Sequence, residues 1–272
     1  MSVPYAEVIG DPIAQSKSPA IHGFWLERLG ITGAYGHSHV RAEELAAYLA
    51  QRRSDADWRG CNVTMPHKQA IMRLLDRIDP LAARIGAVNT VVREPAGTLA
   101  GYNTDAPGFW EPLAGRAFQV ATVIGAGGAA RAVLAALADS GTQWVSIQNR
   151  SFDKAAALLA EFGLEGAAFP LGAAVPPAAL LINTSALGMA GQPPLPALLD
   201  SLAAGATVYD IVTTPLDTDL LREARAKGFD TVDGLSMLIG QADHAFARFF
   251  GERPPRGEDA ELRRRIAASV PA

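Results

Sequence analysis

The feature that most constrains the fold of this chain is a glycine-rich segment, Gly125-Ala126-Gly127-Gly128-Ala129-Ala130. It follows an apolar run ending in Val123-Ile124 and opens an alanine-rich stretch, so the pattern predicts a strand, a tight turn and a helix. The first glycine permits the turn, and the second lets backbone approach a pyrophosphate. The helix N-terminus then offers unpaired amides to the phosphates. The segment predicts a Rossmann-type, doubly wound dinucleotide-binding domain, with residues 125–129 on the phosphates.

The next predicted strand, at 144–148, distinguishes between the two dinucleotides. An NAD site usually places an acidic residue about twenty residues after the glycines, on the ribose hydroxyls. Here the strand is followed by Asn149-Arg150-Ser151 and then Lys154. Arginine with neighbouring donors suits a 2′-phosphate, which a carboxylate would repel. We therefore predict NADP, bound by Asn149, Arg150, Ser151 and Lys154; the alternative is a helix cap at Ser151 beside a surface arginine.

The length of 272 residues predicts about two domains. Alternating strands and helices in the first half predict an α/β domain with a mostly parallel sheet, at residues 1–106. Its expected strands are 3–10, 35–40, 60–64, 87–92 and 98–103, and its helices 19–29, 42–53 and 66–75. The dinucleotide-binding domain is expected at 107–234, with strands 119–124, 144–148, 179–182 and 207–211 and helices 128–140, 152–162 and 216–227. Further helices are expected at 235–250 and 258–268.

Composition excludes several functional classes. The formal charge of −4 gives no general basic excess, so we expect no nucleic-acid partner. The uncharged stretch at 166–199 is interrupted by prolines, which are incompatible with a membrane helix. The single cysteine, Cys61, cannot form an internal disulfide, and residues 1–7 lack the pattern of a secretory signal. We expect a cytoplasmic protein.

Five further segments carry polar residues that a fold alone would not require. They are Gly10-Asp11-Pro12-Ile13-Ala14-Gln15-Ser16-Lys17-Ser18-Pro19, Asn62-Val63-Thr64-Met65-Pro66-His67-Lys68, Gly86-Ala87-Val88-Asn89-Thr90, Gly101-Tyr102-Asn103-Thr104-Asp105 and Met237-Leu238-Ile239-Gly240-Gln241. In this order around the glycine-rich segment, they resemble the shikimate dehydrogenase family. The resemblance extends from Val8 to about Gly251.

The resemblance implies a two-domain enzyme that reversibly reduces 3-dehydroshikimate to shikimate with NADPH. It implies that Lys68 and Asp105 are the catalytic pair, and that residues 235–272 return to complete the substrate domain formed by 1–106. The implied substrate contacts are Ser16, Ser18, Thr64, Lys68, Asn89, Asp105 and Gln241, with Thr213 at a position where the family has a tyrosine. On the cofactor side the resemblance adds Ile211 and Gly234.

The chemistry of the proposed pair is consistent with its residue types. Reduction of a ketone needs a proton donor at the developing alkoxide, and oxidation needs an acceptor for the same proton. We expect Lys68 in the first turn of a helix that begins at Pro66, where the helix dipole lowers its pKa and a neighbouring Asp105 raises it. The alternative interpretations are a solvated lysine and, for Asp105, a helix N-cap ahead of Pro107.

Four other polar residues also have a structural alternative. Ser18 precedes Pro19, so we expect a dual role as helix N-cap and substrate contact. Asn89 is expected inside an apolar strand, where a specific polar partner is needed. Gln241 borders an apolar helix face and is alternatively an exposed residue. His67 has no further ligands at metal-binding spacing, so we expect no metal.

Three positions depart from the family pattern: Gln15 stands where histidine is common, Gly23 where asparagine is usual, and Thr213 where the family has tyrosine. Threonine is much shorter, so a substrate contact is lost or bridged by water. The closest alternative function is therefore a dehydrogenase of quinate or of an aminated shikimate, followed by a dehydrogenase of another substrate. A non-catalytic nucleotide-binding sensor is the alternative of a different class. The expected assembly is a monomer or a homodimer.

Overall fold

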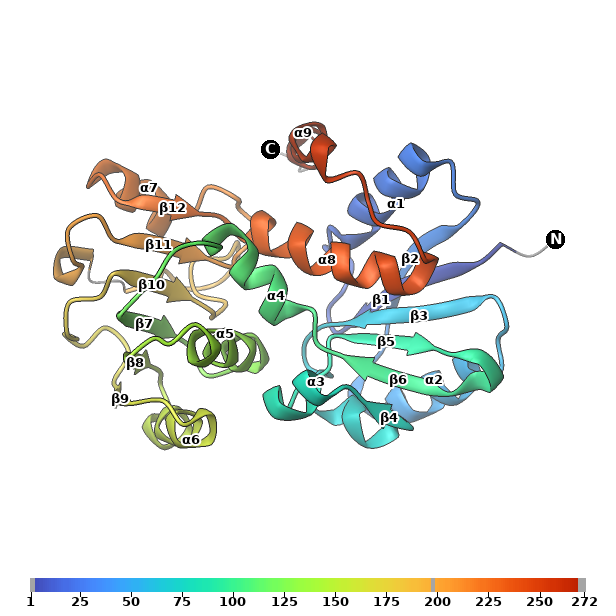
Figure 1. Ribbon diagram of the computed structural model, residues 1–272, viewed down its shortest axis with the longest axis horizontal. Coiled ribbons are helices and arrows are strands. Elements are labelled where there is room, and N and C mark those ends of the chain that lie inside the picture. Colours follow the sequence, from blue (N-terminus) through green and yellow to red (C-terminus); the bar gives the residue numbers. More distant parts are fainter. Residues whose placement is uncertain (1–2, 197–198, 269–272) are drawn as a thin grey trace. The chain divides into compact units, whose positions relative to one another are not determined.

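The computed structural model describes residues 3–196 and 199–268, and the chain divides into two compact units. Unit 1 contains the residues up to 104 together with those from 239 onwards, and unit 2 contains residues 105–238. Each unit has its own six-stranded sheet (Figure 1). The second division falls inside one helix, α8 (Gly234–Phe250), whose residues are therefore shared between the units.

The sheet of unit 1 has the strand order β2-β1-β3-β5-β6-β4. Its strands are β1 (Tyr5–Gly10), β2 (Ala34–His39), β3 (Trp58–Val63), β4 (Arg77–Ile78), β5 (Thr90–Arg93) and β6 (Leu99–Tyr102). The β1 strand is parallel to β2 and β3, whereas β5 is antiparallel to both β3 and β6. Since β4 is parallel to β6, five of these six strands run in one direction and β5 runs against them, so the sheet is mostly parallel, as predicted, with one antiparallel strand. The β5–β6 connection is too short for the crossover that a parallel pair requires.

The helices of unit 1 are α1 (Ser18–Leu29), α2 (Leu45–Arg53), α3 (Pro80–Ile85) and α9 (Asp259–Ala268), with the 3₁₀ turns η1 (Ala42–Glu44), η2 (Ala70–Leu74), η3 (Pro95–Gly97) and η6 (Arg256–Glu258). Two predictions are wrong here. No α-helix begins at Pro66: the chain makes turns until η2 starts at Ala70. The N-cap of α1 is Lys17, and Ser18 is already helical without a capping hydrogen bond.

The core of unit 1 lies between its sheet and helices. Fully buried apolar side chains from different strands meet there, among them Ile9, Trp58, Val91 and Leu99. Because adjacent residues of a strand point to opposite faces, this burial fixes which side chains of β1 and β3 face the core. It also aligns the ends of these strands, where Ile9 pairs with Val63.

The sheet of unit 2 is entirely parallel, in the order β12-β11-β10-β7-β8-β9. Its strands are β7 (Val120–Ile124), β8 (Trp144–Gln148), β9 (Gly166–Phe169), β10 (Leu180–Asn183), β11 (Thr207–Asp210) and β12 (Asp230–Val232). The chain proceeds from β7 to one edge and then returns to build the other edge from β10. The carboxyl end of β7 therefore lies at the switch point, where doubly wound sheets bind their ligands.

The helices of unit 2 are α4 (Asp105–Trp110), α5 (Gly128–Asp139), α6 (Phe152–Phe162) and α7 (Asp219–Ala226), with the 3₁₀ turns η4 (Glu111–Leu113) and η5 (Leu199–Ser201). The predicted bounds of β8 and α6 agree with the structure, while β4, α3, β9 and β12 were not predicted from the sequence. These four elements are short, so hydrophobic periodicity carries little signal for them. In the described residues, no helix is long and apolar enough to cross a membrane.

Candidate active site

The glycine-rich segment forms the tight turn between β7 and α5 in unit 2. Gly125 has a φ of +107°, and a Cβ there would lie 2.8 Å from the Thr184 hydroxyl oxygen, so only glycine fits. Gly127 is exposed, and no atom lies within 4 Å of where its Cβ would be. It is the N-cap of α5 and supplies no side-chain capping bond. The backbone amides that open α5 therefore meet the requirements of a phosphate site.

The residues after β8 present cations at the surface of unit 2. Arg150, Ser151 and Lys154 are all exposed, and neither the Arg150 nor the Lys154 side chain forms a hydrogen bond or ion pair with another described residue. Asn149 donates from Nδ2 to the Ser151 carbonyl at 3.0 Å, which orders the turn. Ser151 occupies the N-cap position of α6, yet its hydroxyl caps nothing. The geometry thus suits binding of a 2′-phosphate better than it suits the alternative of a capping serine.

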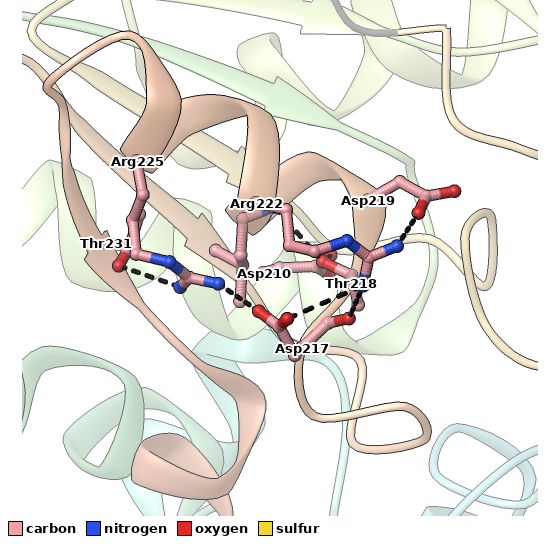
Figure 2. A network of polar contacts seen from close by, with 8 residues as sticks. Asp210, Asp217, Thr218, Asp219, Arg222, Arg225 and Thr231 are labelled. Carbon is pink, nitrogen blue, oxygen red and sulfur yellow. Dashed lines mark hydrogen bonds and ion pairs between the residues drawn. The ribbon is translucent and has the colours of Figure 1, made fainter.

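The loop after β11 is held from inside by a buried carboxylate, Asp210. Its Oδ1 accepts hydrogen bonds from Asn183 Nδ2 at 2.9 Å and from the Val212 amide at 3.1 Å. Its Oδ2 accepts one from the Thr218 hydroxyl at 2.8 Å (Figure 2). Burial raises the pKa of Asp210 above the usual carboxyl value, and these three hydrogen bonds oppose the rise. The loop that carries Ile211 and Thr213 is therefore tied at both ends.

The outer end of the same loop is fixed by ion pairs at the surface. The Asp217 carboxylate pairs with Arg225 and Arg222 of α7, and Arg222 also pairs with Asp219 (Figure 2). Arg225 additionally reaches the Thr231 hydroxyl at 3.4 Å. Such exposed pairs contribute little energy each, so their effect here is on the position of the loop.

Gly234, which begins α8, lets that helix approach the loop after β11. A Cβ at Gly234 would lie 2.3 Å from the Val212 carbonyl oxygen and 2.5 Å from the Ile211 carbonyl oxygen. No larger residue fits without moving the loop, because real Cβ atoms do not come that close to backbone. The structure thus brings together Ile211 and Gly234, which the family resemblance assigns to the cofactor.

In unit 1, the loops after β1 and β3 lie next to each other because the two strands pair. The Thr64 amide donates to the Ile9 carbonyl at 3.0 Å, and the Asp11 amide donates to the Met65 carbonyl at 3.0 Å. Ser16 is half-buried and its Oγ accepts a hydrogen bond from the Ser18 amide at 3.3 Å. Two of the predicted substrate segments are therefore adjacent in space.

Lys68 lies in the turns between β3 and η2 and is half-buried. The Val88 amide donates to its carbonyl at 2.8 Å, and the preceding His67 is tied through Nε2 to the Val40 carbonyl at 2.6 Å. Since no α-helix begins at Pro66, the expected placement of Lys68 in a first helical turn is wrong. Asp105 is buried and is the first residue of α4 in unit 2. The alternative interpretation made it the N-cap of this helix, which would be the residue before the first helical one.

A buried cluster of polar side chains joins Asn89, Thr104 and Gln241, and we call it the amide cluster. The Asn89 Oδ1 accepts from the Thr104 amide at 2.7 Å, and its Nδ2 donates to the Thr104 hydroxyl at 2.9 Å and to Gln241 Oε1 at 3.4 Å. Gln241 is buried, which contradicts the exposed alternative. Asn89 lies one residue before β5 rather than inside a strand, yet its backbone is paired on both sides: its amide donates to the Tyr102 carbonyl at 3.0 Å, and its carbonyl accepts from the Val63 amide at 2.7 Å.

Sequence reasoning assigned no individual role to several polar residues that support these sites. Thr90 and Asn62 contact the amide cluster from neighbouring strands, while Asn183 and Asp210 hold the loop of unit 2. Each is a polar residue in an apolar run, and that signal alone marks a buried hydrogen-bonding role. In residues 3–196 and 199–268, no group of three His, Cys, Asp or Glu side chains is arranged to hold a metal ion.

A parallel, doubly wound sheet with a glycine turn at its switch point, joined to a mixed α/β unit, defines a two-unit dinucleotide-binding protein. A profile described as the shikimate dehydrogenase substrate binding domain matches residues 8–91, and one described as shikimate / quinate 5-dehydrogenase matches residues 113–173. The chain belongs to the shikimate dehydrogenase family. The predictions of family and fold class are confirmed.

Individual relatives match over nearly the whole chain. A shikimate dehydrogenase (NADP(+)) of Sphingopyxis alaskensis is 59% identical over 267 residues, covering 97% of this chain and 97% of its own. One from Paramagnetospirillum magneticum is 47% identical over 273 residues, covering 92% of this chain and 93% of its own. Among solved structures, shikimate 5-dehydrogenase from Thermus thermophilus in complex with NADP(H) and shikimate has a TM-score of 0.87 and 40% identity, covering 97% of this chain and 99% of that chain.

Proposed function

We propose that this chain is an NADP-dependent shikimate dehydrogenase that interconverts 3-dehydroshikimate and shikimate. The observation that carries the proposal is the 59% identity, over 97% of the chain, with a shikimate dehydrogenase (NADP(+)). The likeness to a structure in complex with NADP(H) and shikimate, at a TM-score of 0.87, supports it. The turn that opens α5 would supply the phosphate site that such a reaction needs, and the amide cluster would supply buried groups for binding the substrate.

The residues of unit 2 fit the dinucleotide. The amides at the start of α5 would bind the pyrophosphate, and Arg150 with Ser151 and Lys154 would bind the 2′-phosphate. Ile211, in the loop after β11, and Gly234, at the start of α8, would border the nicotinamide end. NADPH, when bound, supplies the hydride for the ketone carbon.

The residues of the substrate segments would bind the cyclic acid and handle the proton of its reacting oxygen. Ser16, Ser18, Thr64, Asn89 and Gln241 would bind the ring hydroxyls and the carboxylate through hydrogen bonds. Lys68 and Asp105 would hold the proton that is delivered to the ketone oxygen during reduction and recovered from the hydroxyl during oxidation. Such proton transfer contributes about 10²–10⁴-fold to the rate.

The experiment is a four-way assay of nicotinamide absorbance, with shikimate or quinate as substrate and NADP or NAD as cofactor. We expect the highest kcat/KM with shikimate and NADP. A preference for quinate would support the alternative of a quinate dehydrogenase. Nucleotide binding without turnover of either acid would instead support the sensor alternative and contradict the proposal.

The setting of the enzyme is part of the proposal. We infer that it works in the cytoplasm on small-molecule substrates, as a monomer or homodimer and without nucleic acid or membrane. The formal charge of −4 supports the absence of a nucleic-acid partner. Sedimentation of the purified protein distinguishes monomer from dimer.

A further inference from the structure

A tyrosine of β2, Tyr35, begins a line of hydrogen bonds that runs across the sheet of unit 1. Its hydroxyl donates to Asn62 Oδ1 on β3 at 2.6 Å. Asn62 is buried, and its Nδ2 donates in turn to the Thr90 hydroxyl on β5 at 3.0 Å. Three strands are thereby linked through side chains as well as through their backbones.

The line then reaches the amide cluster. The Thr90 hydroxyl donates to Asn89 Oδ1 at 3.1 Å, and Asn89 Nδ2 donates to Gln241 Oε1 at 3.4 Å. Every link runs in one direction, from donor to acceptor, starting at the Tyr35 hydroxyl. Hydrogen-bonded chains in a low-dielectric interior strengthen one another in this way.

A backbone partner, together with this line, orients each of the two asparagine amides. If Asn62 were flipped, its oxygen would face the Asn89 carbonyl oxygen, to which its Nδ2 donates at 3.4 Å, and the Thr90 oxygen, whose hydrogen is given to Asn89. For Asn89, the Thr104 amide, which can only donate, holds Oδ1 at 2.7 Å. The Tyr35 hydroxyl adds to this arrangement by giving Asn62 Oδ1 its donor, which keeps Asn62 and Thr90 in place against Asn89.

The Tyr35 hydroxyl is itself held in place by its ring. The ring stacks face to face on His22 of α1, with centroids 3.9 Å apart and planes 4° apart. Neither ring nitrogen of His22 has a hydrogen-bond partner among the described residues. Burial lowers the pKa of His22 to about 3, so the imidazole stays uncharged and serves as a flat packing surface.

We propose that Tyr35 is a positioning residue that holds Asn62 and Thr90 against Asn89, and through the amide cluster affects the fit of a polyhydroxylated cyclic carboxylic acid. This inference rests on the proposed function. Tyr35 touches no reacting atom, so its effect belongs to substrate binding rather than to the chemical step. The variant Tyr35→Phe keeps the stacked ring and removes only the hydroxyl.

We expect Tyr35→Phe to raise the KM for shikimate about tenfold, which is about 1.4 kcal/mol, because the buried Asn62 Oδ1 loses its donor. We expect kcat and the KM for NADP to change less than threefold. The matched control is Tyr48→Phe, which removes a hydroxyl that donates to the buried Glu7 at 2.8 Å in the same unit. Tyr48→Phe should lower the melting temperature and leave the KM for shikimate unchanged. A KM for shikimate within twofold of wild type in Tyr35→Phe would overturn the inference.

A second test asks whether Tyr35 acts through Asn62. The double variant Tyr35→Phe with Asn62→Ala should have the same KM for shikimate as Asn62→Ala alone, because the donor has then lost its acceptor. KM effects that multiply would mean a separate route and would contradict the proposed line of hydrogen bonds.

These outcomes are separable from those of the proposed function. Turnover of shikimate by the wild type tests the function, whereas the ratio of KM values tests Tyr35. If quinate is the substrate, the same variants are compared with quinate: the assignment to shikimate then fails, and the role of Tyr35 is judged on the quinate ratio. A wild-type enzyme that neither turns over nor binds either acid overturns both.

Discussion

At the scale of single residues, Lys68 and Asp105 differ from the other polar residues of the candidate site in the chemistry they offer. Lys68 is placed by backbone hydrogen bonds around it rather than by a helix, since the Val88 amide holds its carbonyl at 2.8 Å. Asp105 is buried at the start of α4, next in the chain to Thr104 of the amide cluster.

We therefore expect Lys68→Ala and Asp105→Asn each to lower kcat by about 10²–10⁴-fold while the protein still binds NADPH. If the two groups share one proton, the double variant should lose far less than the product of the single losses. Steady-state kinetics and NADPH fluorescence titration measure both quantities. Turnover within a few-fold of wild type in either single variant would return these residues to the solvated-lysine and helix-terminus interpretations.

Arg150 tests the choice of dinucleotide. Its guanidinium is exposed and has no partner among the described residues, so Arg150→Ala disturbs no internal contact. A charge-assisted hydrogen bond is worth about 1.5–3 kcal/mol, so the Kd for NADP should rise tenfold or more. The Kd for NAD serves as the internal control and should hardly change. Equal losses for both cofactors would contradict a 2′-phosphate site.

Thr213 tests the departure from the family pattern. It is half-buried in the loop that Asp210 ties down, so its backbone is fixed while its side chain is short. If a tyrosine contact has been lost, Thr213→Tyr should lower the KM for shikimate with little change in the KM for NADP. Improvement for quinate but not for shikimate would show that the pocket serves the other acid.

At the scale of secondary-structure elements, α1 shows that backbone conformation and available space are separate constraints. Gly23 lies in the middle of this helix, and Gly30 follows its end with a φ of +61°. At both positions no atom lies within 4 Å of an added Cβ. Only the backbone differs.

Gly23→Ala should therefore raise the free energy of unfolding by about 0.5–1 kcal/mol, because alanine is the better helix former. Gly30→Ala is the matched control. It should lower stability by about 1 kcal/mol, because alanine is strained in the left-handed region. Urea unfolding measures both, and a destabilised Gly23→Ala would show that the asparagine-to-glycine departure at this position serves packing.

At the scale of the whole molecule, His22 couples stability to pH. Burial lowers its pKa from 6.5 to about 3 in the folded state. The unfolded chain therefore binds a proton between these values that the folded chain does not. The contribution of His22 to the free energy of unfolding is therefore complete above pH 6.5 and is lost progressively as the pH falls below that value.

The slope contributed by this histidine is at most about 1.4 kcal/mol per pH unit, or roughly 2 kcal/mol between pH 6.5 and 5. His22→Phe keeps an aromatic ring against Tyr35 and should remove that part of the pH dependence. The exposed His37 of β2 provides the control, and His37→Gln should leave the slope as it is in wild type. Urea unfolding at several pH values decides it: a slope unchanged in His22→Phe would show that another group titrates there.

What the sequence by itself determined is mostly local. The bounds of β8 and α6, the glycine turn after β7 and the order of alternating strands and helices follow from periodicity and turn chemistry, which act between neighbours in the chain. The same local reasoning wrongly began a helix at Pro66 and placed the N-cap of α1 at Ser18. In both cases the prediction rested on a proline that is typical of a helix start. After Pro66, the chain is instead held by a tertiary contact, between His67 Nε2 and the Val40 carbonyl.

Only the tertiary structure decided which polar residues meet. Gln241 and Asn89 are 152 positions apart, and Tyr35 and Asn62 are 27 apart, yet each pair shares a hydrogen bond. The family resemblance identified Asn89 and Gln241 as site residues. No sequence pattern pointed to Tyr35. The register of β2, β1 and β3 and the return of the chain in α8 bring these groups together. A buried donor needs an acceptor, and the packing of the whole core determines which acceptor lies within reach.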